Sequence, residues 1–195
     1  MFARTERLLL RPGWTEDAKA LYQAVADANI VCHLGNAPWP YTADDAHDFT
    51  KKSHDPRYPH FFLFRRGAGE SRLVGGCGLV EEDGETEMGY WITRPYWGQG
   101  YASEAVRALV NIAWSVGHRQ LVASHFTDNI AAKRVLEKAG FESTGLTKMR
   151  HSEGWGHAAP CAIYRRSLVD DGHDDTIAGR YGNMPMAYPK RPIAA

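Results

Sequence analysis

The chain has 195 residues, of which 44% are hydrophobic and 24% charged, a composition typical of one globular domain with a core of its own. The 23 Lys and Arg residues balance the 23 Asp and Glu residues, which argues against a protein that coats nucleic acid or an anionic membrane. Because no apolar run approaches the roughly 20 residues of a membrane span and the N-terminus turns polar at once, we expect neither a membrane partner nor a secretory signal.

The N-terminal part predicts one strand and two helices. Residues 6–11 form a short apolar run before Pro-Gly, which is typical of a buried strand. Thr15 stands where an N-cap would precede a helix, and the apolar positions of that helix lie three or four residues apart: Ala18, Leu21, Tyr22 and Val25. Thr42 and Asp45 form a capping box that predicts a second helix over 42–53.

Three strands are predicted next, over residues 60–64, 73–80 and 85–92, separated by glycine-containing turns. Asp83-Gly84 is a strong hairpin signal between the last two strands. The three strands therefore predict an antiparallel meander.

Helices and strands alternate in the C-terminal part. A strand leads through a glycine turn into a helix, a strand and a second helix follow, and two strands close the domain. These elements are predicted over 101–116, 121–126, 129–139, 145–150 and 162–168, with Gly117 and Gly140 ending the helices and Phe141 folding back on Leu136. The order of elements predicts an α/β domain of three layers with a mixed sheet.

The composition changes after Val169, which divides the chain into a domain over 1–169 and a tail over 170–195. The tail is rich in charge, proline and glycine and has no periodic apolar face, as in a flexible segment. Its tyrosines and methionines leave a second interpretation open, an extended arm that docks on a neighbouring subunit.

The chain contains three cysteines, Cys32, Cys77 and Cys161. They are an odd number and lie far apart, so we expect reduced thiols in a cytoplasmic protein. The histidines show no helical i,i+4 pairing and have no clustered cysteine partners, so no metal is expected.

Gly98-Gln99-Gly100 is the most informative segment, because a strand gives way to a helix there. Glycine permits positive φ angles, and the first amides of a helix have no intrahelical partner and lie at the positive end of its dipole. Such a turn either seats an anion, usually a phosphate, or only permits a bend. A dinucleotide fingerprint would need glycine or alanine in place of Ser103, and a P-loop would need lysine after Gly100. The order of elements favours the diphosphate of an acyl-coenzyme A.

Four motifs resemble those of one family. Residues 97–105 (WGQGYASEA) resemble motif A of the GNAT superfamily of acetyl-CoA-dependent N-acetyltransferases, and residues 129–141 resemble its motif B. Residues 5–12 and 38–42 look like those of the ribosomal-protein acetyltransferase (RimJ/RimL-like) branch. The resemblance covers about residues 5–168. It implies a mostly antiparallel mixed sheet with helices on both faces, whose strands splay into a wedge for acetyl-CoA.

The resemblance also implies which residues bind acetyl-CoA. Pantetheine would bond the backbone near Trp91 and Ile92. The diphosphate would lie on the turn made by Trp97, Gly98, Gln99, Gly100, Tyr101, Ala102 and Ser103. Asn129 would hold the pantetheine arm, although an N-cap role explains it equally well. Lys133 would approach the phosphates, unless it is only a solvated lysine on a helix face.

The implied reaction moves an acetyl group to a primary amine, on a protein N-terminus or a small molecule, and it needs a base for the ammonium proton. Glu87 lies on the strand that leads to the cofactor and is the first candidate; the alternative is an edge carboxylate paired with an arginine. His125 is the second candidate, unless it is a structural histidine. Ala132 and Leu136 occupy the positions where relatives carry a proton donor, so no general acid is assigned.

The family's acceptor groove lies between two loops, which correspond here to residues 29–41 and 151–160. The candidate contacts to the amine are His33, Trp39, Tyr41 and Trp155. They would act through cation–π contacts and hydrogen bonds, or the tryptophans would only pack the loops down.

The sequence leaves two other functions open. The missing donor in motif B favours a catalytically silent acyl-CoA-binding module, whereas Glu87 and the intact turn favour an enzyme. A nucleotide-binding protein is a weaker alternative that depends on the glycine turn alone. Proteins of this branch are often dimeric, so a homodimer is among the expected assemblies.

Overall fold

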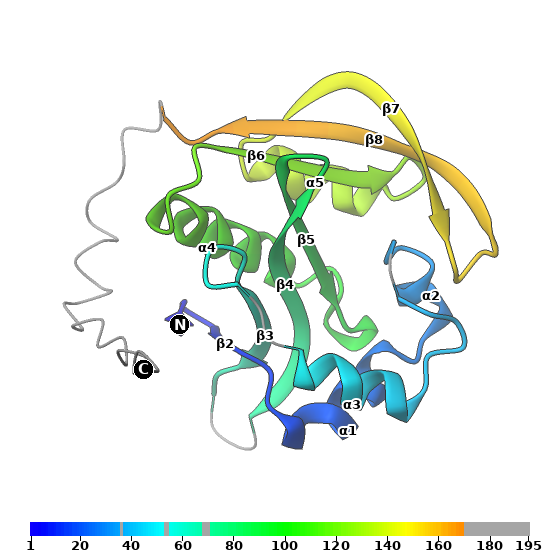
Figure 1. Ribbon diagram of the computed structural model, residues 1–195. Coiled ribbons are helices and arrows are strands. Elements are labelled where there is room, and N and C mark those ends of the chain that lie inside the picture. Colours follow the sequence, from blue (N-terminus) through cyan, green and yellow to red (C-terminus); the bar gives the residue numbers. More distant parts are fainter. Residues whose placement is uncertain (36, 53–54, 68–70, 170–195) are drawn as a thin grey trace, which may run out of the picture.

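The computed structural model describes residues 1–35, 37–52, 55–67 and 71–169. One sheet of eight strands runs through this part of the chain in the order β1-β2-β3-β4-β5-β6-β8-β7, and helices cover both of its faces (Figure 1). The predicted three-layer α/β fold is confirmed. The two interpretations of the tail concern residues 170–195, which lie outside the described residues. No helix within the described ranges is long and apolar enough to cross a membrane.

The strands are β1 (Ala3–Arg4), β2 (Leu8–Arg11), β3 (His60–Arg65), β4 (Arg72–Glu82), β5 (Glu85–Ile92), β6 (Gln120–Phe126), β7 (Glu142–Ser152) and β8 (His157–Ser167). The α-helices are α1 (Ala18–Val25), α2 (Ala28–Val31), α3 (Ala43–Lys51), α4 (Tyr101–Ser115) and α5 (Ile130–Lys138). Two short 3-10 helices, η1 (Thr15–Asp17) and η2 (Arg94–Tyr96), precede α1 and α4.

Most of the predicted turn and cap signals are confirmed. Thr42 and Asp45 form the capping box of α3, and the Asn129 side chain accepts a hydrogen bond from the Ala132 amide at the start of α5. Gly140, at φ 75°, closes α5 with the paired backbone bonds of a Schellman motif, from Phe141 to Leu136 and from Gly140 to Glu137. The Asp83-Gly84 turn connects β4 to β5.

Two N-terminal predictions were wrong in detail. Thr15 does not cap α1, because it begins η1 instead. The reason is Asp17, whose carboxylate accepts the Trp14 amide at 2.8 Å and forms a buried ion pair with Arg11 at 2.7 Å, which tightens the turn. The loop over 29–41 also begins within a helical turn, because the Asp27 side chain caps α2.

The sheet opens between β5 and β6. β4 pairs with β5 along the whole of β5, and β8 pairs with β6 along the whole of β6. The parallel strands β5 and β6, however, pair only at Glu87 with Val122 and at Met88 with Ala123. Beyond Met88 the two strands diverge, which confirms the predicted wedge.

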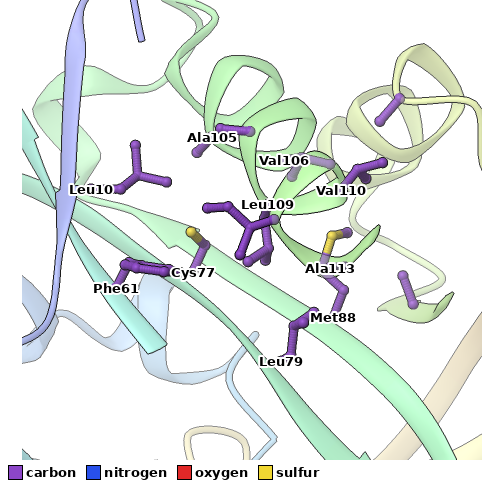
Figure 2. Close-up of a cluster of buried hydrophobic side chains, with 14 of the residues drawn as sticks. Leu10, Phe61, Cys77, Leu79, Met88, Ala105, Val106, Leu109, Val110 and Ala113 are labelled. Atoms are coloured by element: carbon purple, nitrogen blue, oxygen red, sulfur yellow. The ribbon is translucent and has the colours of Figure 1, made fainter. Parts of the chain in front are cut away.

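Side chains alternate between two hydrophobic clusters, one on each face of the sheet. Leu10, Phe61, Leu79 and Met88 pack against α4 on one face, where Leu109 is fully buried (Figure 2). On the other face, side chains such as Phe62 and Phe64 of β3 pack against α1 and α3. In β5 the alternation directs Met88 and Ile92 to the α4 cluster and Trp91 to the other. The core therefore fixes α4, and with it the turn that precedes α4.

The long β7–β8 hairpin bends toward α2, and its turn packs there (Figure 1). The Ser152 hydroxyl donates a hydrogen bond to the Cys32 carbonyl at 2.8 Å. Gly154 lies so close to the same segment that a Cβ at this position would come within 2.5 Å of the Cys32 backbone nitrogen. Only glycine fits there, so the turn and the end of α2 are held together. All three cysteines of the chain are buried and free.

Candidate functional site

The turn before α4 presents a row of unsatisfied amides. Gly98 and Gly100 have φ angles of 72° and 81°, and Gly100 is the N-cap of α4. The first backbone bond of the helix runs from the Glu104 amide to the Gly100 carbonyl at 3.1 Å. The amides of residues 98–103 find no acceptor among the described residues. These free N–H groups, at the positive end of a fifteen-residue helix, form a cradle for an anion.

Side chains of the turn fold back on the segment that precedes it. The Trp97 indole donates a hydrogen bond to the Ile92 carbonyl at 2.6 Å, and the Gln99 side-chain amide donates to the Pro95 carbonyl at 2.9 Å. The cradle is thereby tied to the end of β5, which is one wall of the wedge. The Ile92 carbonyl, on the strip of backbone predicted to bond pantetheine, is therefore already engaged.

Asn129 and Lys133 each make a contact within the α5 segment that explains the residue without a cofactor. Asn129 accepts the Ala132 amide at 2.9 Å and so acts as an N-cap. The Lys133 ammonium lies 3.8 Å from the Glu137 carboxylate on an exposed helix face. Their roles toward a cofactor stay predictions.

Glu87 lies at the point where β5 and β6 part. Its side chain is buried, and its two carboxylate oxygens are both engaged. The Ser124 hydroxyl donates to Oε1 at 2.8 Å, and Arg150 of β7 donates to Oε2 at 2.5 Å. Glu87 is thus paired with an arginine, as in the alternative, but it is buried on an inner strand beside the wedge and is not an edge carboxylate.

Arg150 joins Glu87 to a second carboxylate. Its Nη2 lies 3.2 Å from Oε1 of Glu82. Burial, and then the hydrogen bond and charge of Glu87, raise the pKa of Glu82. Two carboxylates therefore share one guanidinium at the closed end of the wedge, and a proton is bound there more readily than by an isolated glutamate.

His125 lies on the opposite face of β6 from Ser124 and Glu87. Its imidazole is buried, with Nδ1 2.8 Å from the Phe126 carbonyl and its ring centroid 5.3 Å from that of Tyr164 in β8. Nε2 is buried without a partner among the described residues. The structure therefore does not bring the two candidate bases together. The Nδ1 and ring contacts of His125 are those of a structural histidine, but its Nε2 is left unsatisfied by the described residues.

Tyr90 and Ser124 carry hydroxyls on β5 and β6, the two strands that form the wedge. The Tyr90 hydroxyl donates to the Ala132 carbonyl at 3.3 Å, and burial raises the pKa of Tyr90. Ser124 is engaged by Glu87. The Tyr90 hydroxyl therefore lies beside Ala132, one of the two α5 positions that lack a donor side chain.

A groove of about 1890 Å³ is lined by residues from both faces of the sheet, from α4 as well as from α1 and α3, and on the face that carries Glu87 glycines form its floor. A Cβ at Gly76 would lie 2.6 Å from the Trp91 indole nitrogen, and a Cβ at Gly78 would lie 2.8 Å from the His60 ring. The two rings can lie on the strand only because these residues are glycine. A Cβ at Gly89 would meet nothing within 4 Å, so the floor is open there.

The four predicted acceptor contacts are separated. Tyr41 lines the groove, and burial raises its pKa to about 12. His33 and Trp155 lie together instead at the contact between α2 and the β7–β8 turn, with ring centroids 5.4 Å apart. Burial lowers the pKa of His33. Trp39 is 41% exposed and does not line the groove.

The sequence interpretation missed the glycine floor and His60. Glycines inside a strand mark a close approach of another group, so Gly76 and Gly78 could have indicated that side chains lie against this strand.

No metal site is found in the described ranges, where no three His, Cys, Asp or Glu side chains are grouped to hold an ion.

Comparisons with known proteins match this geometry. The family model described as "Acetyltransferase (GNAT) domain" matches residues 7–142, more than half of the chain. An uncharacterised N-acetyltransferase, p20 of Bacillus licheniformis, is 28% identical over 152 residues, which cover 74% of this chain and 84% of that protein.

Solved structures show the same fold. An acetyltransferase of the GNAT family from Bacillus anthracis is 25% identical, has a TM-score of 0.73, and is matched over 86% of this chain and 98% of that one. RimL, a ribosomal L7/L12 alpha-N-protein acetyltransferase solved with coenzyme A, is 18% identical with a TM-score of 0.68, over 86% of this chain and 98% of that one.

Arg150 bridges Glu82 and Glu87, so we expect Arg150→Met to lower the free energy of unfolding by an amount that depends on pH. Because the pKa of Glu82 is raised in the folded protein, stability falls as the pH rises through that raised pKa. Without Arg150 the two ionised carboxylates repel, so we expect a loss of about 2 kcal/mol near pH 7.5 and less than half of it near pH 4.5. Urea unfolding at both pH values measures it. Arg165→Met is the control, because its pair with Glu85 is exposed. A loss independent of pH would contradict the shared charge.

Proposed function

This chain belongs to the GNAT acetyltransferase family, and from that premise we propose that it transfers the acetyl group of acetyl-CoA to a primary amine. The observation that carries the proposal is the row of free amides over residues 98–103, beside the strands that part after Met88. A cosubstrate with a diphosphate and a long amide-containing arm fits such a cradle and wedge. The RimL neighbour was solved with coenzyme A, which supports this assignment.

The donor-side residues in the proposal are those of the turn and the wedge. The amides of Gln99 to Ser103 would bind the diphosphate, and the backbone near Trp91 would bind the pantetheine arm. When bound, acetyl-CoA supplies an acyl group activated as a thioester. Asn129 and Lys133 keep their proposed supporting roles.

The acceptor in the proposal is a protein N-terminus or a small-molecule amine. The RimL neighbour acts on a protein N-terminus, which supports the former and the RimJ/RimL-like branch. Three carboxylates line the groove, Asp45, Asp48 and Asp55, together with the cations of Arg4 and Lys52 and the N-terminal Met1. In the proposal, a protonated amine would pair with one of these carboxylates.

The proposed reaction takes place above Gly89, which lies two residues along the strand from Glu87, roughly 7 Å away on the same face. The amine nitrogen forms a bond to the acetyl carbon, the carbon–sulfur bond breaks, the nitrogen loses a proton and the sulfur gains one. Glu87 is the proposed acceptor of the nitrogen's proton, directly or through a water molecule. Arg150 and Ser124 hold the two carboxylate oxygens of Glu87 in place.

Release of coenzyme A thiol tests the activity. The protein is incubated with acetyl-CoA and a panel of N-terminal peptides, polyamines and small amines, and the free thiol is measured. Amine-dependent release is the expected result. Tight binding of acetyl-CoA with no release for any amine would instead favour the catalytically silent module, which the lack of a donor at Ala132 and Leu136 also supports.

Glu87→Gln separates chemistry from binding. The amide retains the shape of the carboxylate but accepts a proton poorly, so we expect kcat to fall by about 10²- to 10⁴-fold. The Kd for acetyl-CoA, measured by calorimetry, should stay within about twofold. Glu85→Gln is the matched control, because Glu85 lies on the same strand in an exposed pair with Arg165. Turnover at the wild-type rate in Glu87→Gln would remove Glu87 from the mechanism.

We expect Ser103→Asp to weaken the binding of acetyl-CoA while it stabilises α4. An acidic residue in the first turn of α4 stabilises the helix by about 0.5 kcal/mol. The same carboxylate would compete with the diphosphate for the free amides, so we expect the Kd for acetyl-CoA to rise more than tenfold. Ser103→Ala is the control, because it retains the amide. Unchanged affinity in the aspartate variant would place the diphosphate elsewhere.

A further inference from the structure

Arg7 comes from the segment between β1 and β2, and its side chain lies against the cradle. Its Nη1 donates a hydrogen bond to the Gln99 carbonyl at 2.8 Å. Its Nε donates to Oε2 of Glu104 at 2.7 Å. One planar guanidinium therefore joins the middle of the glycine turn to the first turn of α4.

Glu104 completes this connection from inside the protein. Its carboxylate is buried and accepts hydrogen bonds from the Thr5 hydroxyl at 2.5 Å and from the Arg7 amide at 2.8 Å. Burial alone would raise the pKa of Glu104, but these bonds from Thr5 and Arg7 lower it. The ionised carboxylate thus fixes the segment of residues 5–7 to α4.

The same guanidinium covers two more residues of the cradle. Its carbon lies 4.5 Å from the centre of the Tyr101 ring, which is buried and packs edge-on against Tyr96. A Cβ at Gly100 would lie 3.4 Å from Arg7 Nη2. The contacts of Arg7 therefore converge on Gln99, Gly100 and Tyr101, three of the residues whose amides are free.

We propose that Arg7 is a positioning residue for acetyl-CoA, which holds the cradle in its binding conformation through Gln99 and Glu104. This inference rests on the proposed function, in which the cradle binds the diphosphate. The Trp97 and Gln99 side chains tie the turn to the end of β5, and Arg7 ties it to α4, so this second clamp lowers the ordering cost of binding. Arg7 acts through the backbone it holds.

Calorimetric titration with coenzyme A tests the proposal on Arg7→Met and Arg7→Lys. Lysine retains the charge but cannot bond Gln99 and Glu104 at once with a planar fork. We expect the Kd to rise about tenfold in both variants, since a charge-assisted bond is lost. In steady-state assays, KM for acetyl-CoA should rise in parallel while kcat stays within about twofold. Arg7→Lys also serves if Arg7→Met does not fold.

Arg66→Met is the matched control. Arg66 holds the same segment from another side, by donating to the Thr5 and Glu6 carbonyls at 2.5 and 3.3 Å. Within the described part of the chain its side chain makes no hydrogen bond to the cradle. The Kd of Arg66→Met for coenzyme A should stay within about twofold of the wild-type value. Wild-type affinity in Arg7→Met, full affinity in Arg7→Lys, or an equal loss in Arg66→Met would overturn the proposal. Failure of the wild-type protein to bind coenzyme A would instead overturn the proposed function.

Discussion

The site depends on backbone N–H and C=O groups that find no hydrogen-bond partner within the described fold. A sheet normally satisfies the backbone of its central strands, yet β5 and β6 pair at only two positions and then part. A helix always leaves its first amides without partners, and α4 begins with a glycine turn that offers no side-chain cap. Both sets of free groups lie near the end of β5, where the Trp97 indole ties the turn to Ile92. A ligand that fills the wedge and the cradle would complete these hydrogen bonds.

The packing on the two faces explains why this opening keeps its shape. On one face the buried side chains of α4 lock the helix to the sheet (Figure 2). On the other face the glycine floor lets His60 and Trp91 lie close to the strands and leaves space above Gly89. The Arg150 ion pair and the Ser124 hydroxyl hold the Glu87 carboxylate at the point where β5 and β6 part.

The sequence predicted the elements that depend on local chemistry. The capping box at Thr42, the Asn129 cap, the Gly140 stop and the glycine turn each need only neighbouring residues, and all are present. The pairing of Glu87 with Arg150 and the separation of Tyr41 from Trp155 depend on residues far apart in the chain. Sequence periodicity specifies which face a side chain occupies, whereas the partner that it meets is decided by how β7 and the loops pack.

A crystal structure of the protein grown with coenzyme A would locate the diphosphate. We expect its oxygens to lie within hydrogen-bonding distance of the amides of residues 99–103, with the pantetheine arm between β5 and β6. A diphosphate bound elsewhere, or these amides capped by a side chain while coenzyme A is present in the crystal, would contradict this expectation.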